Sequence, residues 1–334
     1  MLYPFLFHPI LKERVWGGRK LASLYGKQLP ADLPIGESWE ITDRPGDVSL
    51  IVNGPLAGKD LRWLMEKHGK ELLGAAPSAN GRFPLLIKIL DAQDTLSLQV
   101  HPPAHKAAEL QGEAKTEMWY IADAAPQTEI FVGLKRGITR RKFEEKLRSG
   151  DVADCFHRVS VKTGDAMFLP SGRVHALGGG LVIFEIQQNS DTTYRVFDWN
   201  RKGLDGKPRD LHVEQALASI DFGDFEPALV SAREVTLGPS ARPAALYRSL
   251  VNDPLFSVSL VTMNSTESVL VGRQPTFEIV GAVAGRMVIA TSTGDSVELA
   301  AGKFCLIPSG IQTEFWLEAG SKTLRIKPGI AAYR

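Results

Sequence analysis

Residues 164–175 read GDAMFLPSGRVH, and residues 302–313 repeat the outline as GKFCLIPSGIQT. Each copy has a glycine, a short run in which side chains alternate between two faces, and a Pro-Ser-Gly turn. Such a phrase is typical of a strand followed by a turn that directs the third residue after the second glycine back into a β-barrel. That residue is His175 in the first copy and Thr313 in the second. The repeat therefore predicts two related β domains, of which the first carries an imidazole at this place.

The sequence around both copies is also typical of β structure. The 31 glycines and 20 prolines lie between short hydrophobic runs, which favours an all-β sandwich or barrel over alternating strands and helices. Up to residue 200, strands are predicted at 39–43, 49–52, 84–90, 95–101, 117–122, 129–133, 159–161, 166–169, 181–188 and 193–198, and further strands follow between 256 and 330.

Helical patterns are fewer and short. Helices are predicted at 60–73 after an Asp cap, at 103–111, at 138–149 with Thr139 as cap, and at 213–220. The stretch at about 134–158 is then a small helical insertion between strands. A segment rich in Pro, Ala and Ser at 225–245 predicts a boundary between domains at 1–235 and 236–334.

Composition limits the class of protein. The chain has 334 residues, is 44% hydrophobic and 23% charged, and carries a formal net charge of +1, so disorder is excluded and no charge pattern favours nucleic acid or an anionic membrane. The N-terminus lacks the basic start of a signal peptide. Cys155 and Cys305 lie in apolar stretches, which is typical of free thiols in a reducing compartment. We expect a cytoplasmic protein, a monomer or a weak homodimer, without nucleic-acid or membrane partners.

Polar side chains at strand positions predict a metal site. Gln99 and His101 share one face of a strand because side chains two residues apart point the same way, and Lys115 and Glu117 share a face in the same manner. His175 arrives from the Pro-Ser-Gly turn. Taken singly, each is typical of a core histidine or of half an ion pair. Together they offer an amide oxygen, two imidazoles and a carboxylate, a set that suits a divalent ion of the zinc type.

Two further residues draw attention. Lys88 lies in the otherwise apolar strand LLIKIL, where a buried ammonium is costly unless it meets an anion, although its stem could instead extend to the surface. Trp16 could line a pocket, but its sequence context favours a plain core or gate aromatic residue.

The motifs carry a family resemblance. The phrase ending at His175 resembles the second cupin motif, and Gln99-Val-His101 stands where the first cupin motif has His-x-His. Beyond cupins in general, four separated motifs resemble the type I mannose-6-phosphate isomerase family in its shorter bacterial form. They are SLQVHP at 97–102, KTEMWYI at 115–121, VHALGGG at 174–180 and SDTTYRVFDWNR at 190–201.

The resemblance implies a cupin (jelly-roll) β-barrel with a metal-free, cupin-like C-terminal domain. It also implies an enzyme that interconverts mannose 6-phosphate and fructose 6-phosphate through an enediol(ate), with one Zn²⁺ per chain. Carried over by motif, the zinc ligands are Gln99, His101, Glu117 and His175, the active-site lysines are Lys88 and Lys115, and the acid–arginine pair is Asp191 and Arg195.

Several roles stay open at this stage. Arg195 offers a planar fork of donors that suits a phosphate, and Lys115 would bring an ammonium to the cavity of the metal. Asp191 is a candidate base or hydrogen-bond organiser, although Asn189-Ser-Asp191 also fits a simple Asx turn. Longer family members carry a His before the Lys of the KxE phrase, where this chain has Ala114, so a ring-opening role for that His does not transfer.

Three alternatives to this function remain. A cupin oxygenase would prefer an iron site that is rich in imidazole, or one built from two histidines and one carboxylate with open positions. Gln99 argues against this alternative. A non-catalytic sugar-binding cupin would not need ligands, lysines and an arginine together in one cavity. An isomerase of another sugar phosphate is compatible with the same residues.

Overall fold

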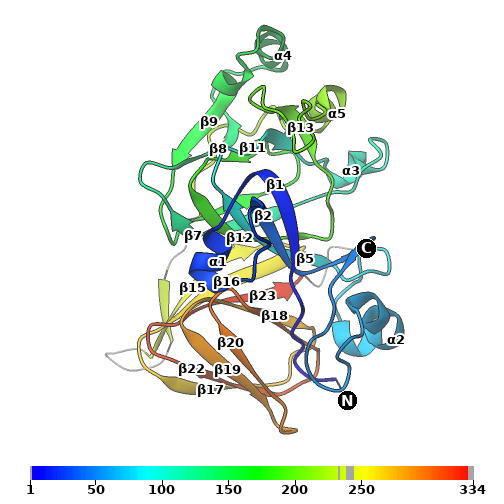
Figure 1. Cartoon of the computed structure of the whole chain (residues 1–334), viewed down its shortest axis with the longest axis vertical. Helices are drawn as coiled ribbons and strands as arrows, with labels where there is room; N and C mark the ends of the chain where they lie inside the picture. The colour runs from blue at the N-terminus through cyan, green and yellow to red at the C-terminus, as the bar shows by residue number, and fades with distance from the viewer. Residues whose placement is uncertain (1, 232–233, 238–243, 330–334) are drawn as a thin grey trace.

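Four antiparallel sheets are stacked in the computed structural model, which describes residues 2–231, 234–237 and 244–329 (Figure 1). The two sheets before residue 200 face each other as an open sandwich, and the two after residue 233 form a second one. This is the mainly β, cupin-like jelly-roll architecture that the sequence predicts, with paired sheets rather than one closed barrel.

The first sandwich holds the predicted metal-site residues. Its six-stranded sheet has the order β1 (Ile10–Gly18), β2 (Ile35–Ile41), β5 (Leu85–Ala92), β12 (Leu181–Gln188), β7 (Glu117–Ala124) and β10 (Ala166–Leu169). Its five-stranded sheet has the order β13 (Tyr194–Phe197), β6 (Leu98–Val100), β11 (His175–Leu177), β8 (Glu129–Leu134) and β9 (Phe156–Ser160). A small separate hairpin pairs β3 (Asp43–Arg44) with β4 (Asp47–Val48).

The second sandwich repeats this order of strands. Its six-stranded sheet runs β14 (Glu234–Leu237), β15 (Ala245–Asn252), β16 (Phe256–Met263), β23 (Lys322–Pro328), β18 (Glu278–Ala284) and β21 (Phe304–Ile307). Its four-stranded sheet runs β17 (Glu267–Val271), β22 (Thr313–Leu317), β19 (Arg286–Thr291) and β20 (Ser296–Ala300). In both units the Pro-Ser-Gly phrase follows the last strand of the larger sheet, and the next strand begins at His175 or at Thr313.

The helices lie at the ends and flanks of the sheets. Asp60 caps α2 by accepting the Trp63 N–H at 2.7 Å, and Thr139 caps α4. The predicted insertion corresponds to α4 and a 3₁₀ turn, both between β8 and β9. The predicted helix at 103–111 is shorter than expected, and α1 was not predicted. The bounds are α1 (Lys20–Tyr25), α2 (Leu61–Leu73), α3 (Ala104–Ala107), α4 (Arg140–Ser149), the 3₁₀ helix η1 (Val152–Cys155) and α5 (Val213–Ser219).

The strand predictions also have gaps. No strand was predicted at β1, where three consecutive charged residues, Lys12, Glu13 and Arg14, interrupt the alternation of apolar and polar side chains. The predicted strand at 49–52 is reduced to isolated bridges, Phe7 to Ile51 and Leu50 to Asp60. Both cysteines are buried and unpaired. Within the described ranges, no helix is long and apolar enough to cross a membrane.

The two six-stranded sheets bury a common core. Side chains on one face of each sheet, such as Ile89 on β5 and Ile326 on β23, pack in the core between the two units. Side chains at the alternate positions of β5, such as Lys88, lie on the opposite face and point into the first sandwich. We propose that the two sandwiches are the two domains, with the boundary just before β14; positions 232–233 and 238–243 of the predicted linker lie outside the described residues. The N-terminal segment crosses this boundary, because Phe5 and Leu306 exchange backbone hydrogen bonds of 2.8 and 3.0 Å.

Phe184 lies at the centre of the common core. Its ring is fully buried, 5.7 Å from the ring of Tyr25 and 5.6 Å from that of Phe304 in the second unit. We expect Phe184→Ala to lower the free energy of unfolding by about 3–5 kcal/mol, since it removes buried area and leaves a cavity. Urea unfolding followed by tryptophan fluorescence measures this. Phe222→Ala, at a half-buried ring beside α4, is the control; an equally large loss there would contradict the central role of Phe184.

Candidate active site

The four predicted ligands come together at one end of the first sandwich. His175 on β11 pairs in register with Gln99 on β6, and His101 follows that strand closely. Glu117, the first residue of β7, reaches them from the opposite sheet. Its Oε2 lies 3.4 Å from His101 Nε2 and its Oε1 lies 3.4 Å from His175 Nε2. The carboxylate is therefore held between two imidazoles, and Gln99 Nε2 lies 3.2 Å from His175 Nε2.

Backbone carbonyls fix the orientation of both imidazoles. His101 Nδ1 lies 2.7 Å from the carbonyl oxygen of Thr192, and His175 Nδ1 lies 2.9 Å from that of Arg173. A carbonyl only accepts hydrogen bonds, so each Nδ1 carries the proton and each Nε2 presents a lone pair to the centre of the cluster. Outer contacts of this kind are typical of metal-ligating histidines.

The residues present fit a divalent metal ion. The ligand atoms of His101, Glu117 and His175 all lie within 4.8 Å of one another. Within the described residues, His101 Nε2 and Glu117 Oε1 are buried without a hydrogen-bond partner, while the Lys115 ammonium lies 2.9 Å from Glu117 Oε2. Buried polar atoms without partners are costly, and a cation among them removes that cost. Gln99 completes the set when its amide oxygen, rather than its nitrogen, faces the centre.

Burial sets the protonation of the cluster. It lowers the pKa of His101 to about 3 and also lowers the pKa of His175, so both imidazoles are neutral at neutral pH. Burial opposes ionisation of Glu117, but Lys115, whose Nζ lies 2.9 Å from Oε2, holds the pKa of that carboxyl well below its ordinary value. Neutral imidazole and ionised carboxylate are the forms that bind metals.

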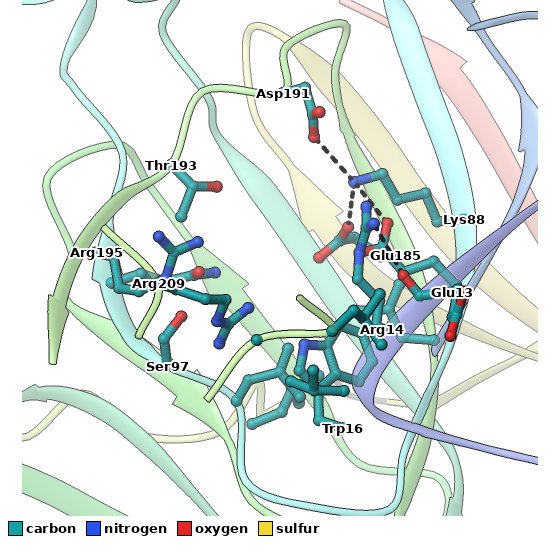
Figure 2. Close-up of a pocket in the computed structure, with 18 of the residues that line it drawn as sticks. Glu13, Arg14, Trp16, Lys88, Ser97, Glu185, Asp191, Thr193, Arg195 and Arg209 are labelled. Carbon is teal, nitrogen blue, oxygen red and sulfur yellow. Dashed lines mark hydrogen bonds and ion pairs between the residues drawn. The ribbon is translucent and has the colours of Figure 1, made fainter. Parts of the chain in front are cut away.

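A cavity of about 530 Å³ opens beside the cluster (Figure 2). Gln99 is the one candidate ligand that lines it, since His101, Glu117 and His175 are at most 1% exposed. The cavity thus reaches the cluster along Gln99 and Lys115. All the other residues singled out from the sequence also line this cavity, namely Trp16, Lys88, Lys115, Asp191 and Arg195.

Lys88 lies in one wall of this cavity among carboxylates. Its Nζ is 3.4 Å from Glu185, 3.7 Å from Glu37 and 3.9 Å from Asp191, as the dashed lines of Figure 2 indicate in part. The anion that a buried lysine requires is therefore supplied by the protein itself. Asp191, which is 51% exposed, forms its ion pair with Lys88 rather than with Arg195.

Glu185 was not singled out from the sequence. It is buried, lines the cavity, and its Oε1 accepts a 2.9 Å hydrogen bond from Trp119 Nε1. Burial raises its pKa, and the nearby Glu117 raises it further. The signal was present in LVIFEIQQ, an apolar strand with one central acid, Glu185, which pairs in register with Lys88.

Glu37 was not singled out from the sequence either. Burial opposes ionisation of its carboxyl group, but Lys88 and Arg14 lower its pKa to about 2.

The wall opposite Lys88 carries two arginines (Figure 2). Arg195 Nη1 donates to the carbonyl oxygen of Asp210 at 2.6 Å, and its Nε is buried without a partner among the described residues. The neighbouring Arg209 is already engaged, because its Nε donates to Asp198 at 2.7 Å. Arg195 is therefore the less compensated cation on this side of the cavity.

A jelly-roll sandwich with a buried His–Glu–His cluster beside a charged cavity defines a cupin-type enzyme with a candidate metal centre. Residues 5–139 match the family model described as phosphomannose isomerase type I, catalytic domain. A mannose-6-phosphate isomerase of Streptococcus mutans is 34% identical over 94% of this chain and 95% of its own length. One of Bacillus subtilis is 40% identical over 65% of this chain and 68% of its own length.

The solved structures agree with these relatives. The crystal structure of the mannose 6-phosphate isomerase from Bacillus subtilis has a TM-score of 0.86 to this chain at 29% identity, and the match covers 97% of this chain and 99% of that one. The chain belongs to the type I mannose-6-phosphate isomerase family. It is an aldose–ketose isomerase.

Proposed function

We propose that this enzyme interconverts mannose 6-phosphate and fructose 6-phosphate with one Zn²⁺ held by Gln99, His101, Glu117 and His175. The observation that carries the proposal is the buried cluster of His101, Glu117 and His175, in which His101 Nε2 and Glu117 Oε1 have no hydrogen-bond partner among the described residues. The cluster lies at the end of a cavity that Lys88, Lys115 and Arg195 line. One carboxylate and three neutral ligands leave a zinc site with a net positive charge. When bound, zinc supplies electrostatic stabilisation of the negative charge that develops on the sugar oxygens.

The side chains around the cavity hold the substrate. Lys115, 4% exposed, extends its ammonium from β7's N-terminal end toward the same centre as Glu117, where it stabilises charge on O1 or O2 of the sugar. Trp16, also 4% exposed, provides an apolar wall that excludes water. Asp191 lies at the more exposed rim and orients Lys88.

Moving a proton between C1 and C2 requires a base within the cavity. Glu185 is a better candidate than Asp191, because it is buried, lines the cavity and has a raised pKa that makes its carboxylate a stronger base. Its Oε2 faces Lys88, whose charge keeps enough of the carboxylate ionised to accept the proton. Glu185 then returns the proton to the neighbouring carbon, and the hydroxyl proton moves between O2 and O1, so that the carbonyl group changes place between C1 and C2.

The experiment that tests the function is a coupled assay on mannose 6-phosphate with the purified protein, before and after treatment with a chelator. We expect turnover that is lost on chelation and restored by zinc. Oxygen consumption with bound redox-active iron would favour an oxygenase instead. Metal-loaded protein that binds the sugar phosphate without turnover would indicate a non-catalytic cupin. Faster turnover of another sugar phosphate would mean that mannose 6-phosphate is not the preferred substrate.

Arg195→Ala tests the phosphate contact. We expect kcat/KM for mannose 6-phosphate to fall by about 10–100-fold, since one charge-assisted contact to the phosphate is lost, while the slow reaction of free mannose changes little. Parallel assays on both sugars measure this. Arg209→Ala is the control and should lose less, because Asp198 already engages Arg209. An equal loss for both sugars would put Arg195 outside the phosphate site.

We propose a cytoplasmic enzyme, a monomer or a weak homodimer, whose partner is a sugar phosphate and not a nucleic acid or a membrane. The net charge of +1 and the two buried free thiols support this assignment.

A further inference from the structure

The second sandwich has a polar cavity of its own. It measures about 290 Å³ and is lined by residues of β15, β16 and β23, on the sheet face that points away from the first sandwich. Its polar lining includes Tyr247, Ser249, Ser257, Ser259, Arg325 and Lys327.

Strand register relates this cavity to the active site. Glu117 begins β7 and pairs with Leu169 at the end of β10, while Glu278 begins β18 and pairs with Ile307 at the end of β21. Glu278 therefore occupies the place of Glu117.

The adjoining strands correspond in the same way. In the first unit Lys88, Glu185 and Trp119 are successive partners across three strands. In the second unit those places are held by Ser259, Arg325 and Val280. The cavity is thus the counterpart of the wall that carries Lys88 and Glu185.

The ion pair of Glu278 and Arg325 replaces the metal cluster. Arg325 donates from Nε and Nη2 to the two carboxylate oxygens at 2.6 and 2.7 Å, and its guanidinium lies 5.1 Å from the ring centre of Phe315. Thr313 stands where His175 stands in the first unit. The guanidinium is fixed on two sides, and its Nη1 donates no hydrogen bond to the described residues.

The remaining polar groups leave the cavity with an excess of donors. Lys327 donates at 3.0 Å to the neutral amide oxygen of Gln274, and it has no ion pair among the described residues. In the part of the chain that the structure describes, the side chains of Ser249, Ser257 and Ser259 make no hydrogen bond. Since Glu278 neutralises Arg325, the lining carries a net charge of +1.

The way into the cavity is open. In the first unit β13 flanks β6 and contributes Arg195 to the cavity wall. In the second unit β17, the counterpart of β6, is an edge strand in the described sheet and has no such neighbour. A ligand can therefore reach the serines and Lys327 from solvent.

We propose that this second cavity binds a phosphate group. Arg325 Nη1, the Lys327 ammonium and the serine hydroxyls are donors around one small volume, and a tetrahedral oxyanion has acceptors for all of them. The group comes either from inorganic phosphate or from a phosphorylated sugar, and in both cases the site is separate from the cavity that carries out the isomerisation.

Hydrogen–deuterium exchange of the zinc-loaded enzyme tests this site directly. With added inorganic phosphate we expect slower exchange in peptides covering 249–259 and 322–328, and no such change with free mannose. In Lys327→Gln and Ser259→Ala, the concentration of inorganic phosphate that gives half-maximal protection should rise by about ten-fold or more. The kcat/KM for mannose 6-phosphate should stay unchanged in both variants. Lys322→Gln, on the same strand but outside the cavity, is the control.

The outcomes separate this site from the active site. Absence of protection in these peptides in the wild type, equal protection in Lys327→Gln, or equal protection by free mannose would overturn the proposal. Phosphate protection near Arg195 reports only on the active site. If mannose 6-phosphate protects the second cavity at lower concentration than inorganic phosphate, the ligand is a phosphorylated sugar; equal concentrations mean that the phosphate group alone is recognised.

Discussion

Replacing His175 by alanine is expected to remove the zinc of the proposed site and the isomerase activity together. His175 is one of two imidazoles beside Glu117, with Nε2 3.4 Å from its Oε1. Without it, one imidazole, one carboxylate and one amide oxygen remain around a space that water can enter. This set holds zinc poorly, because an amide oxygen is not among the usual ligands of zinc and only one imidazole is left. We expect the turnover of mannose 6-phosphate to fall by a factor on the order of 10³ or more.

Two measurements check this expectation, zinc per chain by elemental analysis and the coupled assay at saturating substrate. His157→Ala is the matched control, because His157 lies on β9 outside the cluster and should keep both zinc and activity. Circular dichroism of His175→Ala shows whether the variant is folded, so that a loss of zinc or activity is not mistaken for a failure to fold. If the variant retains a full zinc content, His175 is not a ligand.

The cluster of His101, Glu117 and His175 could be predicted because each of its members lies on a strand, next to one or after a recognisable turn. Alternation along β6 puts Gln99 and His101 on one face, and the Pro-Ser-Gly turn delivers His175 to the paired strand. Two contacts needed tertiary structure: the pairing of β6 with β11, which places His175 beside Gln99, and the contact of both histidines with Glu117 across the two sheets. The repeat of residues 164–175 at 302–313 likewise predicted the second sandwich.

The charged wall of the cavity could not be predicted in the same way. Its contacts depend on which strands become neighbours, and Glu185 meets Lys88 only because β12 pairs with β5 in one register. For the same reason Asp191 was expected beside Arg195, four residues further along, whereas the fold turns it toward Lys88. Sequence spacing carries little information on contacts made by loops.

Replacing Glu185 by glutamine is expected to lower kcat by about 10²–10⁴-fold while zinc content and KM change little. Glutamine keeps the shape and can still accept from Trp119, but it cannot take a proton from C1 or C2. Exchange of the C2 proton of the sugar with deuterated solvent, followed by NMR, should slow in parallel with kcat.

The pH dependence separates a base from a merely structural acid. A base must be ionised, and burial raises the pKa of Glu185, so we expect wild-type kcat/KM to decline with falling pH at a higher pH than an exposed glutamate would give. This decline of kcat/KM on the acidic side is the acid limb of the pH profile. Glu185→Gln should lose the acid limb together with most of its kcat. A residue that acted only by holding the ammonium of Lys88 would leave the limb in place.

Glu37→Gln is the matched control, because it also removes a carboxylate from Lys88, at 3.7 Å, without removing Glu185. If Glu185 is the base, Glu37→Gln keeps the acid limb and far more of the rate. Equal losses in the two variants, with unchanged pH profiles, would mean that both acids act through Lys88. The proton transfer would then belong to another group that lines the cavity.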